Sequence, residues 1–203
     1  TIKLRDLINY SLELYNEQNL NFNSENISTD LVIFLKDRFK NYMKEKNVRQ
    51  DIIESSTSSY NIDDILKIYK KASTLNNMIS KDIGLDVIFI YKRASNILID
   101  EINKNNLEIS DIADPGLFKN DFEKKLYKKI HDIRKEFSSI SRENDYKGLL
   151  QSLASAKIEV TEFFENVKVN DADIVIKKNR LELLKMLCKT FDNYFNFSKI
   201  ESL

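Results

Sequence analysis

The chain has 203 residues and carries 32 Lys and Arg against 32 Asp and Glu, so its formal net charge is zero. No overall field draws it to nucleic acid or to an anionic membrane, and any polyanion site must come from a local arrangement of charges. Three Gly and one Pro are too few for the turns of a β-rich chain, which predicts an all-α fold.

The first part of the sequence predicts a series of amphipathic helices. Apolar residues recur there at helical spacing, and a stretch rich in Asn and Ser, 19–28, separates the first two helices. We expect Thr29 to cap the second helix and Asn61 to cap the fourth. The predicted helices of this part are residues 1–18, 30–46, 49–56 and 62–78.

The back of the 30–46 helix carries a stripe of lysines at four-residue spacing, formed by Lys36, Lys40 and Lys44. Like charges at this spacing weaken a helix slightly, and a polyanion partner would offset that cost. Spacing alone favours a solvated lysine face, since charge runs usually are solvated. A phosphate-binding stripe is the alternative.

The segment 85–102 is the most apolar helix of the chain, and we expect the domain to pack around it. Its apolar side chains cover most of the circumference at about 100° per residue, so it should be buried on several sides. The run is too short and too charged in its middle to cross a bilayer, and no membrane partner is expected. A seam interrupts the apolar surface, with Lys92 on its flank, and consists of Asp86, Phe89, Arg93, Asn96 and Asp100.

The irregular stretch 103–116 holds the only proline, and if the chain divides into two parts, it should divide here. Three long helices are predicted after it, over residues 118–141, 146–167 and 172–195. Asn170 or Asp171 should cap the last of them. On its apolar face we expect Cys188 as a small buried hydrophobe, and Arg180 as a charge that needs a partner.

Motifs for catalysis are scarce in this sequence. It has no GxxxxGK[ST] or GxGxxG loop, no His and Cys cluster with metal spacing, and neither a nucleophile elbow nor a kinase motif set. His131 lies on a charged helix and suits a structural or surface role. We therefore expect no catalytic site and no metal in this chain alone, and a function in binding.

The cysteine count and the first residues bear on the compartment. A single Cys excludes an internal disulfide, and no charged and then apolar leader opens the sequence, which together favour the cytoplasm. The length suits one large domain or two small ones, and we expect a single all-helical domain over residues 1–203. Since the first residue is Thr rather than Met, we expect a processed chain or a fragment of a longer protein.

Arginine donors beside aromatic faces suit single-stranded RNA, whose splayed bases stack while its phosphates pair with cations. Phe89 and Arg93 on the seam fit this pattern. Arg93 and Arg180 fit equally well as core arginines. Their partners would then be nearby carboxylates, namely Asp86, Asp100 or Glu182.

Three blocks of the sequence resemble the C-terminal region of the bacterial glycyl-tRNA synthetase β subunit. The most specific pieces are YKRASNIL within residues 86–98, and FFENVKVN and NRLELL followed by FSKI within 163–200. LVIFLKDRFKNYMKEKNVRQDIIES, residues 31–55, precedes them in the family's order, so the resemblance covers essentially the whole chain. It implies an all-helical anticodon-binding domain similar to that of arginyl-tRNA synthetases.

In that family glycine is joined to its tRNA with ATP, mainly on a separate α subunit that forms an α2β2 heterotetramer with β. The resemblance implies that this chain is part of a longer β subunit and grips the anticodon arm of the glycine tRNA. Its other partners would be the α subunit and the remainder of β. ATP and Mg are expected for the whole enzyme and no cofactor for this domain. The alternative is a helical docking module without RNA contact.

The resemblance also places the basic residues of two blocks at the expected RNA face. Phosphate contacts, which fix position and give salt dependence, are expected from Lys36, Lys40, Lys44, Lys92 and Lys178. Base recognition is expected from Phe89, Arg93 and Asn96, unless a neighbouring helix covers their seam. Arg180 belongs to the same blocks and joins the expected RNA-binding residues. The 118–141 helix matches the family only in length and pattern, so its lysines receive no role.

Overall fold

A computed structural model of the chain describes residues 3–16, 18, 24–58, 64–105 and 108–201. Within these ranges all regular structure is helical and no strand occurs, which confirms the all-α prediction. None of the helices in the described part combines the length and the apolarity that a bilayer crossing requires.

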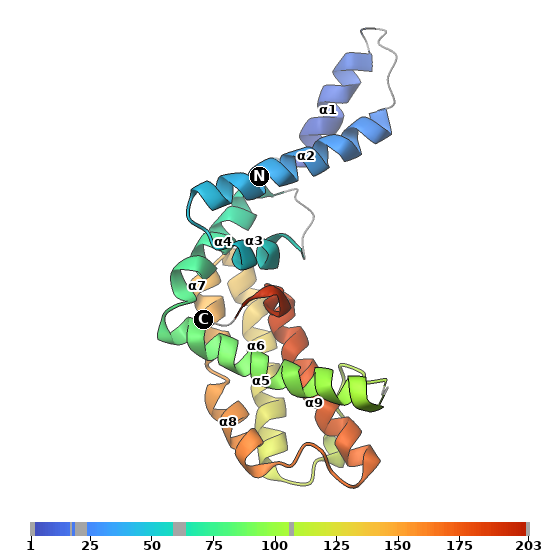
Figure 1. The fold of residues 1–203 in the computed structure, drawn as a ribbon, viewed down its shortest axis with the longest axis vertical. Coiled ribbons are helices and arrows are strands. Elements are labelled where there is room, and N and C mark those ends of the chain that lie inside the picture. Colours follow the sequence, from blue (N-terminus) through green and yellow to red (C-terminus); the bar gives the residue numbers. More distant parts are fainter. Residues whose placement is uncertain (1–2, 17, 19–23, 59–63, 106–107, 202–203) are drawn as a thin grey trace.

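The N-terminal part is a helical hairpin that projects from the rest of the molecule (Figure 1). In it α1 (Leu4–Asn16) packs on α2 (Ser24–Glu45), and α2 also packs on α3 (Gln50–Thr57). Because Ile27 extends the apolar spacing towards the N-terminus, α2 begins well before its expected start. Thr29 therefore lies inside the helix, and its predicted capping role is wrong.

The central position of the apolar segment is confirmed. It lies in α5 (Asp82–Asn105), which crosses the body of the molecule (Figure 1) and packs on α4 (Ile65–Met78) as well as on α7, α8 and α9 (described below). On α5 the side chains of Val87, Ile90 and Ala94 are fully buried. The carboxylate of Asp64 caps α4 by accepting a hydrogen bond from the Lys67 amide at 2.9 Å. The expected cap, Asn61, lies outside the described residues.

The last third differs from its prediction at one break and one cap. After the 3₁₀ turn η1 (Pro115–Leu117) come α6 (Asp121–Glu143), α7 (Tyr146–Ala154), α8 (Lys157–Asn166), α9 (Ile174–Asp192) and a second 3₁₀ turn, η2 (Phe197–Lys199). The predicted 146–167 helix is thus two helices. The Ser155 hydroxyl donates to the Ser152 carbonyl at 2.6 Å, a local bond that competes with the helical ladder. The cap of α9 is Asp173, which accepts from the Val175 amide at 2.9 Å, so the predicted caps are wrong.

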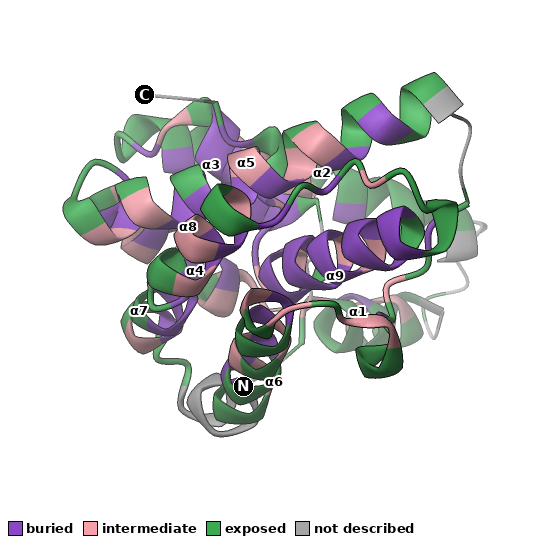
Figure 2. Ribbon diagram, turned by 90° about the horizontal axis from the view of Figure 1, so that it is seen from below, coloured by how far each residue is buried: buried purple, intermediate pink, exposed green. Residues whose placement is uncertain are grey.

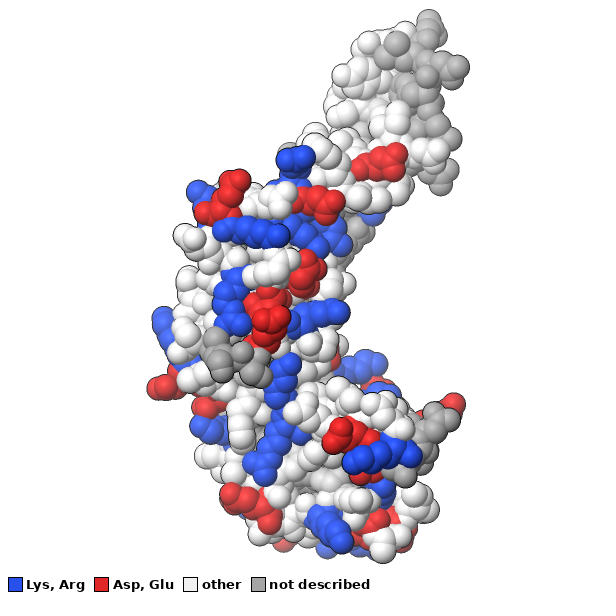
Figure 3. Space-filling model, in the orientation of Figure 1, with Lys and Arg blue, Asp and Glu red and all other residues white. Residues whose placement is uncertain are grey.

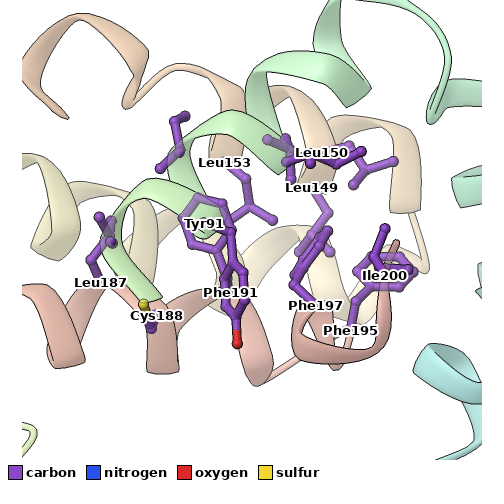
Figure 4. Close-up of a cluster of buried hydrophobic side chains, with 14 of the residues drawn as sticks. Tyr91, Leu149, Leu150, Leu153, Leu187, Cys188, Phe191, Phe195, Phe197 and Ile200 are labelled. Atoms are coloured by element: carbon purple, nitrogen blue, oxygen red, sulfur yellow. The ribbon is translucent and has the colours of Figure 1, made fainter. Parts of the chain in front are cut away.

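The core is densest where α5 meets α9. There α9 is buried along most of its length (Figure 2), and Cys188 is buried as predicted. Tyr91 of α5 lies among the rings of Phe191 and Phe197, with centroids 6.1 and 5.6 Å away (Figure 4). Its hydroxyl donates to the Asp192 carboxylate at 3.0 Å. Helices from both sides of the 103–116 stretch therefore pack together.

One lysine lies within this core. Lys71 of α4 is 2% exposed, and its ammonium nitrogen lies 4.7 Å from the centroid of the Phe195 ring. Burial, with a smaller contribution from the charge of Lys67, lowers the pKa of Lys71 to about 7. The folded protein therefore disfavours the charged form that the unfolded chain carries up to about pH 10.5.

We predict that Lys71→Met raises the free energy of unfolding most at low pH. Between about pH 7 and 10.5 the unfolded state holds the extra proton, so the stability of the native protein rises with pH in this window. Below it the folded protein carries the full cost of the buried charge, and the variant should gain about 2 kcal/mol or more there. The gain should shrink towards pH 10.5. Urea unfolding at about pH 6 and about pH 10 measures both gains, and equal gains would contradict the assignment.

Candidate nucleic-acid interface

The seam of α5 places an arginine between two aromatic rings. The Arg93 guanidinium carbon lies 4.7 Å from the centroid of the Phe164 ring on α8 and 5.6 Å from that of Phe89. Arg93 is half-buried, and Phe89 is 41% exposed. A surface guanidinium that stacks on aromatic rings offers the faces on which unpaired nucleobases stack.

A cavity of about 380 Å³ lies beside Arg93, between α5 and the segment that joins α8 to α9. This volume is at the lower end of the range for small-ligand pockets and exceeds that of a nucleobase. The cavity is lined by Arg93, Ile97, Glu101, Phe164, Val167, Lys168, Val169 and Asn170. Cationic, acidic, amide and aromatic groups thus face one space.

An ion pair between helices fixes the acidic group of this cavity. The Lys177 ammonium of α9 lies 2.6 Å from the Glu101 carboxylate of α5, and both side chains are nearly buried. A pair in this setting is rigid, because separating its members would leave a buried charge.

Arg180 holds the opposite wall in place from inside the protein. It is 5% exposed, and its guanidinium donates to Glu123 at 2.7 Å and to Asp171 at 2.6 Å. It also donates to the backbone carbonyl of Lys168 at 3.0 Å, so it fixes the segment that lines the cavity. Hydrogen bonds from the Asp173 amide and from Arg180 lower the pKa of the Asp171 carboxyl.

These contacts correct the expected role of Arg180. As a buried and fully engaged side chain it is a core arginine and has no surface to offer to RNA. Its partners are Glu123 and Asp171, whereas Glu182, one of the three carboxylates expected as partners, accepts a hydrogen bond from the Ser110 hydroxyl at 3.0 Å.

The other expected RNA-binding residues fall into two groups. Lys92 is half-buried on the flank of the seam, Asn96 is exposed on α5 and Lys178 is exposed on α9. The stripe of α2 is separate, since α2 packs on α1 and α3. Within it Lys40 pairs with Glu54 of α3 at 2.9 Å, while Lys36 is half-buried and Lys44 exposed. The structure therefore does not join the stripe to the seam.

Much of the cavity escaped sequence analysis although a signal for it was present. The FFENVKVN block contributes Phe164, Lys168 and Asn170 to the lining, yet helical spacing assigns them no common face with Arg93. In the described part of the chain no group of three or more His, Cys, Asp or Glu side chains is arranged to hold a metal ion.

Comparison with known proteins gives a consistent result. Residues 87–203 match the family described as the DALR anticodon binding domain. The chain is similar to the glycine–tRNA ligase β subunit of Rickettsia canadensis, with 33% identity over 98% of this chain and 28% of the relative. For the β subunit of Clostridioides difficile the identity is 30% over 98% of this chain and 28% of the relative. The chain thus spans little more than a quarter of the length of these curated relatives.

We predict that Arg180→Ala destabilises the protein by about 3 kcal/mol, because it leaves the buried Glu123 carboxylate without its partner. Lys178→Ala, two residues earlier and exposed, should change the free energy of unfolding by less than about 0.5 kcal/mol. Arg180→Met combined with Glu123→Gln removes both charges and should recover part of the loss. Urea unfolding compares the variants, and equal midpoints for Arg180→Ala and Lys178→Ala would refute the structural role of Arg180.

Proposed function

The chain belongs to the DALR anticodon-binding domain family, and from this premise we propose that it binds the anticodon arm of a glycine tRNA as part of a glycine–tRNA ligase β subunit. The family match over residues 87–203 carries the proposal, since it takes in the whole of the Arg93 cavity. The glycine specificity is supported by the β-subunit relatives, which align along 98% of this chain.

The cavity beside Arg93 receives an unpaired base in this proposal. The base stacks against the surface made by Arg93 and Phe164, and the exposed ring of Phe89 offers a second face. Phe89, Arg93 and Asn96 thus keep their proposed role in base recognition, with Glu101 and Asn170 added as hydrogen-bonding groups in the cavity.

Phosphates are held by the lysines around the cavity. Lys92 and Lys178 keep their proposed role, and Lys168 joins them because it lines the cavity and is exposed. Such contacts fix the register of the RNA and make its affinity depend on salt. We leave the α2 stripe out of the interface, since Lys40 is engaged by Glu54 and α2 packs away from α5.

Catalysis then belongs to the whole enzyme. We infer that this chain supports ATP-dependent attachment of glycine to tRNA in the cytoplasm, with an α subunit in an α2β2 assembly. ATP and Mg would act there, outside this domain. The support for this wider assignment is the resemblance together with the relatives, which are glycine–tRNA ligase β subunits.

The test is binding of the chain to the glycine tRNA and to a tRNA with another anticodon, each at low and at physiological salt. Tighter binding to the glycine tRNA, weakened by salt, is the expected result. Equal affinity for both tRNAs would mean that the chain binds RNA phosphates without recognising the anticodon. Failure to bind either at low salt would overturn the proposal in favour of a docking module.

We predict that variants of the interface separate phosphate from base contacts. Lys178→Ala and Lys92→Ala should each weaken glycine tRNA binding and lower the slope of log K against log salt by about 1. Phe164→Leu should cost about 1–3 kcal/mol of binding free energy and leave the slope unchanged. Lys147→Ala, exposed on α7, is the matched control. An equal loss in the control would show that the binding surface lies elsewhere.

A further inference from the structure

The N-terminal hairpin exposes apolar side chains along both of its helices. They are between 37% and 60% exposed and include Leu7, Tyr10 and Leu14 of α1 and Leu31, Phe34 and Tyr42 of α2. Single exposed apolar residues are ordinary, whereas a run of this extent marks an interaction site. Figure 3 shows few charged side chains towards the outer end of the hairpin on this face, and many on the half of α2 nearer the body and on the body itself.

Two different faces of α2 are apolar. One face carries Val32, Phe39 and Met43, which are buried within the molecule. The other carries Leu31, Phe34 and Tyr42, which share a line at helical spacing and remain exposed. A helix that is apolar on two sides is normally covered on both. On the second face, among the described residues, the Tyr42 ring lies 5.9 Å from the Tyr69 ring of α4 and the Arg38 guanidinium lies 5.2 Å from the Phe34 ring, yet Leu31, Phe34 and Tyr42 all stay more than a third exposed.

The hairpin is attached to the body along a narrow contact. Among the described helices α1 packs mainly on α2, and α2 reaches the body mainly through α3. The ribbon shows α1 and the outer part of α2 lying far from α5 (Figure 1). A partner could cover the exposed line of α2 without covering the proposed RNA interface.

The comparisons show which proteins share the hairpin. It lies outside residues 87–203, which match the anticodon-binding family, but inside the alignment with the β-subunit relatives, which covers 98% of this chain. It is therefore common to these β subunits and is not part of the general anticodon-binding unit. The matched region is only 28% of the relative's length, so most of such a polypeptide lies outside it.

We propose that the exposed apolar line of α2, with the adjoining α1 residues, docks on the remainder of the β-subunit polypeptide to which this chain belongs. This rests on the proposed membership of a longer β subunit. Because the hairpin and the rest of the β subunit belong to one polypeptide, their surfaces are at high effective concentration. A small apolar surface is therefore enough for stable docking. RNA is a poorer occupant, because aliphatic side chains such as Leu7, Leu14 and Leu31 offer neither charge nor a stacking face.

Photo-crosslinking in the assembled enzyme tests this directly. Phe34→p-benzoylphenylalanine keeps an aromatic side chain at the centre of the line, and irradiation captures whatever lies against it. We expect intramolecular cross-links to β-subunit residues outside this chain. Cross-links to a second β subunit, to the α subunit or to tRNA, or no cross-link at all, would overturn the proposal. The same substitution at Ile158, which is 69% exposed on α8, is the matched control and should give none of the expected cross-links.

Hydrogen exchange supplies a second, independent measurement. Leu31→Ser in the assembled enzyme should speed amide exchange in α1 and α2 by about tenfold and leave the affinity for glycine tRNA unchanged, while Ile158→Ser should alter neither. Unchanged exchange in Leu31→Ser would count against docking. If the cross-links form but tRNA does not bind, the docking proposal stands and the anticodon-binding proposal fails. If tRNA binds but the cross-links do not form, the anticodon-binding proposal stands and the docking proposal fails.

Discussion

The buried charge network around Arg180 holds together the part of the molecule on which function depends. Its carboxylate partner, Glu123, also accepts hydrogen bonds from the amides of Lys119 and Asn120 at 2.7 and 3.0 Å, at the start of α6. Through Arg180 the same network reaches α9 and the segment between α8 and α9. A buried ion pair is tolerated only when every member is bonded, so this condition fixes three elements relative to one another.

Two buried ion-pair networks fix the shape of the cavity beside Arg93. The Arg180 network positions the wall that carries Lys168, and the pair of Glu101 with Lys177 ties α5 to α9 on the other side. Further along α5 the hydroxyl of Tyr91 bonds to Asp192, and burial raises the pKa of both groups. Polar bonds at both ends of the contact between α5 and α9 thus fix the orientation of the α5 seam. This orientation places the Arg93 guanidinium against the Phe164 ring.

The scarcity of Gly and Pro was enough to predict the fold class, and helical spacing was enough to predict most helices, because each buries a face that recurs with the helical period. Caps were not predictable, since several suitable residues stand near each helix start and the path of the incoming chain selects one. Asp173 in place of Asp171 is such a case, and Asp171 is instead used by Arg180. The need of Arg180 for a carboxylate was predicted, but its buried partner Glu123 lies 57 residues away in the sequence, and helical spacing cannot predict a contact between two different helices. Arg93 was likewise predicted from spacing within one helix, whereas most of the cavity lining comes from α8 and the segment after it, which such spacing cannot relate to α5.

Residues 196–201, which include the turn η2, connect the end of α9 to α3. The Asn196 amide donates to the Ser55 carbonyl at 3.2 Å, and the Glu201 amide donates to the Asp51 carboxylate at 2.9 Å. These bonds fasten α3, the base of the projecting hairpin, to the segment that follows α9. The projecting hairpin is therefore joined, through α3 and residues 196–201, to the same helix that carries Lys177 and Arg180.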